Sequence, residues 1–341
     1  MSSAPEPPVV GSPVRGPAAV SPPVDGHDAF IEPDTATEDG TDDADSALGD
    51  MRGADSTASL GSSIMNFRIE HGRTYHAYKE GNLQHHLFTL SLDGALGLAP
   101  PNEKGSKLNR VLDVGTGTGI WAIDFADEHP EAEVIGVDLS PTQPTFIPQN
   151  LSFEIDDLEE PWTFSKPFSY IHSRMMMVSF YNWKKFFDQS LTHLEPGGYL
   201  ELQDLKFPFL SDDGTLTPDH ALYQWSEFMI EASTKAGKPI NFSAQFEQLM
   251  KDAGFVNVKA KALKWPSNGW PKNKKEKTLG LWQGENLAYG IEGFSLALFT
   301  RILGWTKEEV DVFLMKVKSD IKDRSVHSYL PIYIIYGQKP E

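Results

Sequence analysis

Residues 110–125 read RVLDVGTGTGIWAIDF, and this stretch decides the fold class. An apolar run leads into glycines at positions 115, 117 and 119, and an apolar pattern of helical period follows. Glycine tolerates the backbone of a tight turn and lets a ligand approach the main chain closely. The stretch therefore predicts a strand, a ligand-binding turn and a helix, the opening unit of an α/β nucleotide-binding fold.

Short apolar runs alternate with helical patterns along the rest of the chain. The expected strands are RVLDVG (110–115), EVIGVD (133–138), LSFEID (151–156), FSYIHS (168–173), YLELQDL (199–205), FVNVKAKAL (255–263) and YLPIYIIYGQKP (329–340). Residues 121–129 and 182–194 form helical patterns between strands, and PGG at 196–198 predicts a turn. This alternation predicts a parallel sheet covered by helices.

Three segments differ in composition. Residues 1–58 are rich in Pro, Gly, Ser and acidic residues and have no apolar periodicity, which predicts a disordered tail. Residues 59–108 form two helical patterns, and the second ends at Pro100-Pro101, so a helical cover is expected here. Residues 109–341 are expected to form a single α/β domain with a long helical stretch after the fifth strand.

Charge and cysteine content limit the function classes. The chain has 341 residues, no cysteine and a net charge of −18, of which −10 belongs to residues 1–60. A cysteine nucleophile, disulfides and thiolate metal sites are excluded, and an acidic body disfavours direct nucleic-acid binding. No apolar run is long enough to span a membrane, so we expect a cytoplasmic protein, with the nucleus as the alternative.

The spacing of the glycines does not match the dinucleotide fingerprint. G-x-G-x-x-G requires a third glycine at position 120 or 122, where the chain has Ile120 and Ala122. Asp138 ends the run VIGVD, 19 residues after Gly119, as expected for a carboxylate that binds ribose hydroxyls. NAD enzymes share this carboxylate, so it predicts an adenosine-like ligand without choosing the cofactor.

The charge around the turn separates the candidate cofactors. The third strand ends in FEIDD, which places Asp156 and Asp157 at the carboxyl edge of the sheet, and Asp113 precedes the glycines. The turn itself contains no Lys or Arg. This acidic environment suits a sulfonium and an ammonium group better than it suits a pyrophosphate.

These motifs, taken in order, resemble those of class I S-adenosylmethionine-dependent methyltransferases. VLDVGTGTG, VIGVDLSP, FEIDDLEE and LEPGGYLELQD carry the likeness. RIEHGRTYHAYKEG, LQHHLFTLSLDGALGLAP, YIHSRMM and WQGENLAYGIEGFSLALFTRILGW narrow it to the fungal LaeA-like family, over residues 62–337. The resemblance implies a Rossmann-like seven-stranded sheet whose last strand is antiparallel. It also implies helices on both faces, a helical amino-terminal cover and a helical insertion after strand five.

The resemblance also assigns S-adenosylmethionine-binding residues by motif. The methionine part of the cofactor would lie over the glycine turn, its ribose at Asp138, its adenine at Asp157, and the methyl-transfer face at the end of strand four. The implied cofactor-binding set is Asp113, Gly115, Thr116, Gly117, Gly119, Asp138, Leu139, Asp156, Asp157, Leu158, Ser173, Arg174 and Tyr75, with Tyr78 beside Tyr75 in the cover.

Methyl transfer needs aligned reactants more than it needs a catalytic side chain. His172 is the candidate base, and a hydrogen-bonded structural histidine is the alternative. His85 and His86 are adjacent in sequence, so on a helix they point about 100° apart and do not suit a shared metal. Asp204 lacks a following Asp or Asn, and no metal site is expected.

The sequence is consistent with two functions. The first is methylation of a small molecule in fungal secondary metabolism, and the second is a LaeA-like regulator that acts on gene expression through protein partners. Met175–Met177 predict a soft pocket wall or plain core, and Trp225, Phe228 and Met229 predict core or a pocket edge. The basic run PKNKKEK (271–277) predicts a solvated loop or a dock for an acidic partner.

Overall fold

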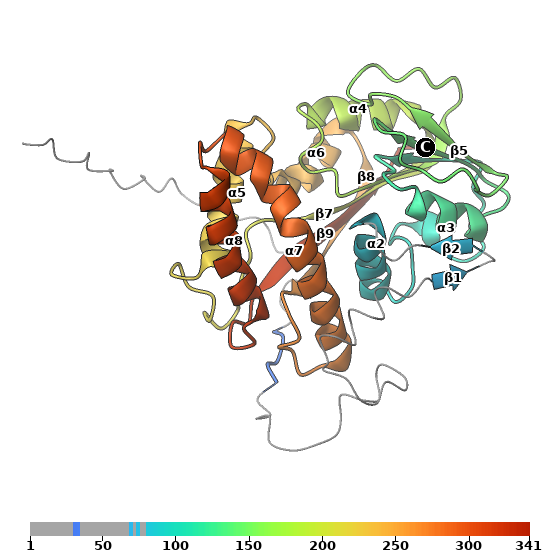
Figure 1. Cartoon of the computed structure of the whole chain (residues 1–341). Coiled ribbons are helices and arrows are strands. Elements are labelled where there is room, and N and C mark those ends of the chain that lie inside the picture. Colours follow the sequence, from blue (N-terminus) through green and yellow to red (C-terminus); the bar gives the residue numbers. More distant parts are fainter. Residues whose placement is uncertain (1–29, 35–67, 71–72, 76–79) are drawn as a thin grey trace, which may run out of the picture.

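The computed structural model describes residues 30–34, 68–70, 73–75 and 80–341 (Figure 1). The predictions for Tyr78 and for most of the amino-terminal tail lie outside these residues. Within the described part of the chain, no helix has the length and apolar character needed to cross a membrane.

A seven-stranded sheet forms the centre of the molecule. Its strand order is β5-β4-β3-β6-β7-β9-β8, and β9 runs antiparallel to both of its neighbours while β3 to β7 are parallel. This confirms the predicted sheet with an antiparallel last strand. The strands are β3 (Arg110–Val114), β4 (Glu133–Asp138), β5 (Leu151–Ile155), β6 (Phe168–Arg174), β7 (Leu194–Leu205), β8 (Val256–Pro266) and β9 (Tyr329–Gln338).

Helices cover both faces of this sheet. Helix α4 (Trp183–His193) and helix α6 (Phe246–Ala253) lie on one side, and α2 (Glu80–Ser91) and α3 (Ile120–Glu128) lie on the other (Figure 1). Buried aromatic side chains join helix to helix on the first face, where Trp183 packs against Phe246 at 4.3 Å between ring centroids. Strands buried by helices on both faces read as nearly continuous apolar runs, which explains their clear signal in the sequence.

The remaining helices stack beyond the ends of β7 and β9 (Figure 1). Helix α5 (Ala221–Lys235) follows β7, as predicted for an insertion after the fifth strand of the sheet. Helices α7 (Lys274–Arg301) and α8 (Lys307–Lys322) form a second insertion between β8 and β9. Together with α2 they enclose a separate apolar core that includes Trp225 and Phe299.

Two local predictions are wrong. The segment expected to be helical around residue 70 contains strands β1 (Arg68–Glu70) and β2 (Arg73–Tyr75), which pair antiparallel. Thr74 and Ile69 are β-branched and face each other in this ladder, so strand pairing prevails over a weak helical period. The predicted turn at 196–198 lies within β7, where the backbone of Gly197 and Gly198 bonds to Lys339 beyond the end of β9.

Residues 30–34 also differ from the predicted disordered tail. Ile31 is buried, and Pro33 forms a bridge with Pro271. Asp34 N donates to Trp270 O at 2.9 Å, and the Asp34 carboxylate pairs with Lys277 Nζ at 2.5 Å. The basic run therefore contacts acidic residues of the same chain, which corrects its interpretation as a solvated loop.

Candidate cofactor and methyl-transfer site

The glycine turn connects β3 to α3 as predicted. Gly115, Gly117 and Gly119 all have left-handed backbone, with φ of 70°, 56° and 79°. The amides of Gly115 and Thr116 both donate to Val137 O, at 2.9 and 3.0 Å, which fixes the turn to the end of β4. The backbone conformation explains the repeated glycine, because other residues strain in this region.

Space around the glycines is uneven. A Cβ on Gly115 would lie 2.2 Å from Met176 Sδ, and one on Gly119 would lie 2.3 Å from Phe153 Cζ. A Cβ on Gly117 would meet no atom within 4 Å. The turn is therefore packed at its two ends and open at its middle, where a ligand can reach the backbone.

Asp138 faces the open middle of the turn. Its Oδ2 accepts from Gly117 N at 2.8 Å, and its Oδ1 accepts from Ser140 N at 3.0 Å. On the other side, Thr142 Oγ1 and Gln143 Nε2 each donate to Gly117 O at 2.7 Å. A carboxylate can accept about four hydrogen bonds, so Asp138 keeps capacity for the hydroxyls of a ribose.

Sequence reasoning missed Thr142 and Gln143. They lie in an irregular loop after β4, and no spacing rule ties such a loop to the glycine turn. Their only sequence signal is the polar cluster that follows VIGVD.

The edge next to Asp138 is both acidic and apolar. Asp156 and Asp157 are exposed, and Asp156 N donates to Asp138 O at 3.3 Å. Leu139 and Ile155 leave 68% and 62% of their surface exposed beside them, and Ile155 pairs with Asp138 in the ladder. This edge offers apolar surface and hydrogen-bond acceptors to a flat ring with an amino group, and Ile155 was missed from the sequence.

Leu158 lies elsewhere. Its side chain is buried in the core under α4, and its carbonyl accepts from Trp162 Nε1 at 2.9 Å. The structure therefore separates Leu158 from the exposed carboxylates that precede it.

Asp113 and His172 form a buried pair behind the turn. His172 Nδ1 lies 2.8 Å from Asp113 Oδ1, and Thr116 Oγ1 donates to Asp113 Oδ2 at 2.6 Å. The imidazole is 0% exposed and stacks on Trp121 at 3.6 Å between ring centroids. Burial lowers the pKa of His172, although the bond to Asp113 opposes this shift. The pair holds Thr116 in place. This arrangement corresponds to the alternative of a hydrogen-bonded structural histidine.

Arg174 joins three elements at the end of β6. Its Nη2 lies 3.1 Å from His85 Nδ1, and His85 Nε2 lies 2.9 Å from Asp124 Oδ2 on α3. The guanidinium also lies over the Phe88 ring at 5.1 Å, and burial lowers its pKa to about 10. Helix α2 is thereby attached to the sheet edge through a charged side chain.

Three further residues that the sequence analysis singled out lie on different elements. Ser173 is completely buried on β6, and Tyr75 is the last residue of β2. His86 lies away from His85 and packs edge-on against Trp282 at 4.7 Å between centroids.

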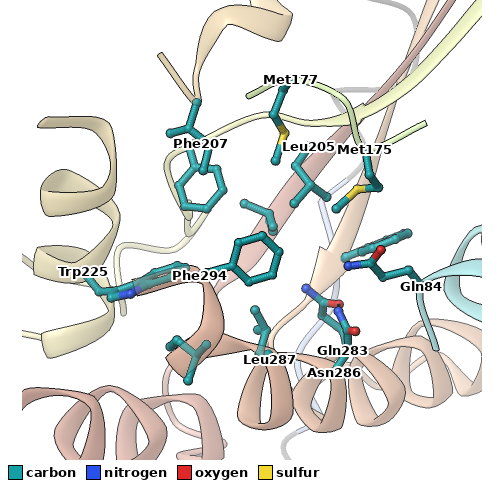
Figure 2. Close-up of a pocket in the computed structure, with 15 residues that line it drawn as sticks. Gln84, Met175, Met177, Leu205, Phe207, Trp225, Gln283, Asn286, Leu287 and Phe294 are labelled. Carbon is teal, nitrogen blue, oxygen red and sulfur yellow. The ribbon is translucent and has the colours of Figure 1, made fainter. Parts of the chain in front are cut away.

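The loop of Met175, Met176 and Met177 separates the turn from a cavity. Met176 covers Gly115, while Met175 and Met177 line the cavity on the opposite side (Figure 2). Met177 N donates to Asp204 Oδ1 at 3.2 Å, and Met175 N donates to Gln203 O at 2.9 Å. Burial raises the pKa of Asp204 well above its usual value, because desolvation disfavours the charged form of this carboxyl.

The arrangement suits a cationic nucleoside. The turn has open space beside the Cα of Gly117, a ribose acceptor at Asp138 and further carboxylates at its edge. Arg174, the nearest cation of β6, is bonded to His85 rather than directed at a phosphate. The residues present therefore fit a sulfonium cofactor better than a dinucleotide.

Comparisons with known proteins give the family. A family model described as "Methyltransferase domain" matches residues 83–260. The probable methyltransferase tdiE of Emericella nidulans is 42% identical over 260 residues, covering 76% of this chain and 80% of its own. The methyltransferase pytC of Aspergillus terreus is 37% identical over 300 residues, covering 84% and 92%.

A third relative carries a different description. The secondary metabolism regulator LAE1 of Cochliobolus heterostrophus is 33% identical over 291 residues, covering 80% of this chain and 95% of its own. The glycine turn, the sheet with an antiparallel last strand and similarities that cover 76–84% of this chain agree. The chain belongs to the fungal LaeA-like family of class I, S-adenosylmethionine-dependent methyltransferases.

Proposed function

We propose that this protein methylates a small molecule in fungal secondary metabolism, with S-adenosylmethionine bound across the glycine turn. The observation that carries the proposal is the pairing of Gly117 with Asp138 at an open turn that contains no cation. When bound, S-adenosylmethionine supplies a methyl group to a nucleophile, and the carbon–sulfur bond breaks with its electron pair retained by sulfur.

The residues of the turn would divide the binding. The methionine part would pack against the Cα of Gly117, whose N–H and carbonyl are already bonded within the site. Asp138 would accept from the ribose hydroxyls. Leu139 and Ile155 would flank the adenine, with Asp156 or Asp157 accepting from its amino group. Met176 covers Gly115 with its thioether side chain, so the cofactor would approach the turn at Gly117 rather than at Gly115.

The structure favours alignment over acid–base chemistry as the chain's contribution. His172 is fully buried, so it is poorly placed to take a proton from an acceptor. Asp113 and His172 instead hold Thr116. Asp204 holds the loop of Met175–Met177. Positioning alone can lower a barrier by about 7–11 kcal/mol.

The regulatory function remains the second candidate, because relatives named as regulators match nearly the same length of chain. The proteins named as methyltransferases, tdiE and pytC, are 42% and 37% identical to this chain, against 33% for LAE1. We therefore favour the enzyme.

A labelled transfer separates the two candidates. The purified full chain is incubated with methyl-deuterated S-adenosylmethionine and with a fungal extract divided into small molecules and proteins. We expect the label in a small-molecule product detected by mass spectrometry. Label confined to the protein fraction, or absent from both fractions, would contradict the proposal.

A further inference from the structure

A cavity lies between the sheet and the helical insertions. It has about 460 Å³ of free space, its open mouth included. Helices α2, α5 and α7 and the loop of Met175–Met177 surround it (Figure 2). Its lining residues are Gln84, Met175, Met177, Leu205, Phe207, Trp225, Ile240, Trp265, Gln283, Asn286, Leu287, Gly290, Ile291, Phe294 and Leu330.

Among the described residues that line it, there is no Asp, Glu, His, Lys or Arg. The indole nitrogens of its two tryptophans are already used, because Trp225 donates to Ser295 Oγ at 2.8 Å and Trp265 donates to Ser91 Oγ at 2.7 Å. The tryptophans therefore present apolar surface to the cavity. A charged ligand would lose its hydration here without gaining an opposite charge.

Three amide side chains supply the remaining polarity. Gln84, Gln283 and Asn286 point into one end of the cavity, opposite Trp225 (Figure 2). Gln283 is only 1% exposed, and its Oε1 accepts from Asn286 Nδ2 at 3.2 Å. Neither Gln283 Nε2 nor Asn286 Oδ1 bonds to another described residue, so a donor and an acceptor lie side by side.

The cavity adjoins the proposed cofactor turn. Met175 and Met177 line it, and Met176 between them contacts Gly115. Met177 is fixed by Asp204, so the wall between the two spaces is anchored. A molecule in the cavity would therefore lie against the same loop as the methyl donor.

We propose that this cavity binds the methyl acceptor, and that the acceptor is an uncharged, largely apolar ring compound with a neutral hydrogen-bonding group at one end. The amide pair of Gln283 and Asn286 would hold that group, and Phe207, Trp225 and Trp265 would pack against the rings. The inference rests on the proposed function for the identity of the reaction. Because none of the described residues that line the cavity is titratable, a proton released by the acceptor would pass to water.

Three probes of one shape test the chemistry of the cavity. The full chain is titrated calorimetrically with 2-naphthamide, the anion 2-naphthoate and the cation 2-naphthamidine. We expect 2-naphthamide to bind at least about tenfold more tightly than either charged probe. Gln283→Leu should weaken it by about three- to tenfold, the range for one lost hydrogen bond. Leu287→Trp, which fills the cavity, should abolish binding.

Gln248→Leu is the matched control, since Gln248 lies on the surface of α6 and bonds to Asp252. It should leave 2-naphthamide binding unchanged, and thermal melting checks that each variant folds. Equal binding of the charged probes, no binding of 2-naphthamide, or binding that survives Leu287→Trp would overturn the cavity proposal. S-adenosylhomocysteine is titrated in the same samples, so failure of the cofactor site is seen separately from failure of the cavity.

Discussion

Asp138 is the side chain that most directly connects the turn to its proposed ligand. Replacing it by Asn leaves one acceptor oxygen where two accept now, from Gly117 N and Ser140 N. A hydrogen bond to a charged group contributes about 1.5–3 kcal/mol, so we expect Asp138→Asn to weaken S-adenosylhomocysteine binding by at least about tenfold. Calorimetry measures the loss.

The control for this variant is Asp188→Asn. Asp188 pairs with Lys184 on the exposed surface of α4, and its loss should not change cofactor binding. Equal affinities of the wild type and Asp138→Asn would remove Asp138 from the site.

Asp204 makes stability depend on pH. Its pKa in the folded state lies well above the ordinary value of 3.8 because the carboxyl is buried. Between these two values the unfolded chain has released a proton that the folded chain retains, so the contribution of Asp204 to stability falls as pH rises. Asp204→Asn cannot ionise and can still accept from Met177 N. We expect the melting temperature of the variant, relative to wild type, to increase from about pH 5 to about pH 8.

Thermal melting across this range measures the effect. A difference between variant and wild type that does not change with pH would show that Asp204 titrates normally.

At the scale of the element, the strand–turn–helix unit contains a close contact between Gly115 and Met176. An alanine at a position with left-handed backbone lowers the free energy of unfolding by about 1–2 kcal/mol through backbone strain alone. Gly214→Ala measures that cost alone, because Gly214 has φ of 75° and no atom within 4 Å of an added Cβ. Gly115→Ala should cost at least about 1 kcal/mol more, since its Cβ meets Met176.

Met176→Ala tests this assignment as a second substitution. Added to Gly115→Ala, it should restore the additional loss in the free energy of unfolding, measured in urea. Added to Gly214→Ala, it should restore none of that variant's loss. The same effect of Met176→Ala in both combinations would contradict the contact.

The elements also show what sequence reasoning could find. Strands β3, β4 and β6 were predictable because they are buried on both sides and read as apolar runs. The glycines and Asp138 were predictable because a turn of left-handed residues and a ribose carboxylate require these residue types. The contacts of Gln143 with Gly117 and of Met176 with Gly115 were not predictable, because each depends on where a loop folds back. The grouping of amide side chains at one end of the cavity was also not predictable, since Gln84 and Gln283 are 199 positions apart in the sequence.

At the scale of the whole molecule, residues 30–34 contact the segment 270–277, which lies far along the chain. Composition could not reveal this contact, because a short acidic and proline-containing segment resembles its surroundings. Asp34 pairs with Lys277 at 2.5 Å and with Arg324 at 3.7 Å, and its side chain is 19% exposed. The pairing across 243 positions explains why the basic run at 271–277 is not merely solvated.

We expect Asp34→Asn to lower the free energy of unfolding by about 1 kcal/mol, and the loss to shrink in high salt. Glu32→Gln is the control, because the pair of Glu32 and Lys272 is well exposed on both sides and should contribute almost nothing. Urea unfolding at two salt concentrations measures both variants. Equal losses for the two variants would contradict a specific role for Asp34.

The central claim is that the glycine turn binds a methyl donor. The most direct measurement is calorimetric titration of the purified full chain with S-adenosylmethionine, S-adenosylhomocysteine and NAD. We expect both sulfur nucleosides to bind at one site and NAD not to bind. Binding of NAD, or of none of the three, would contradict the claim.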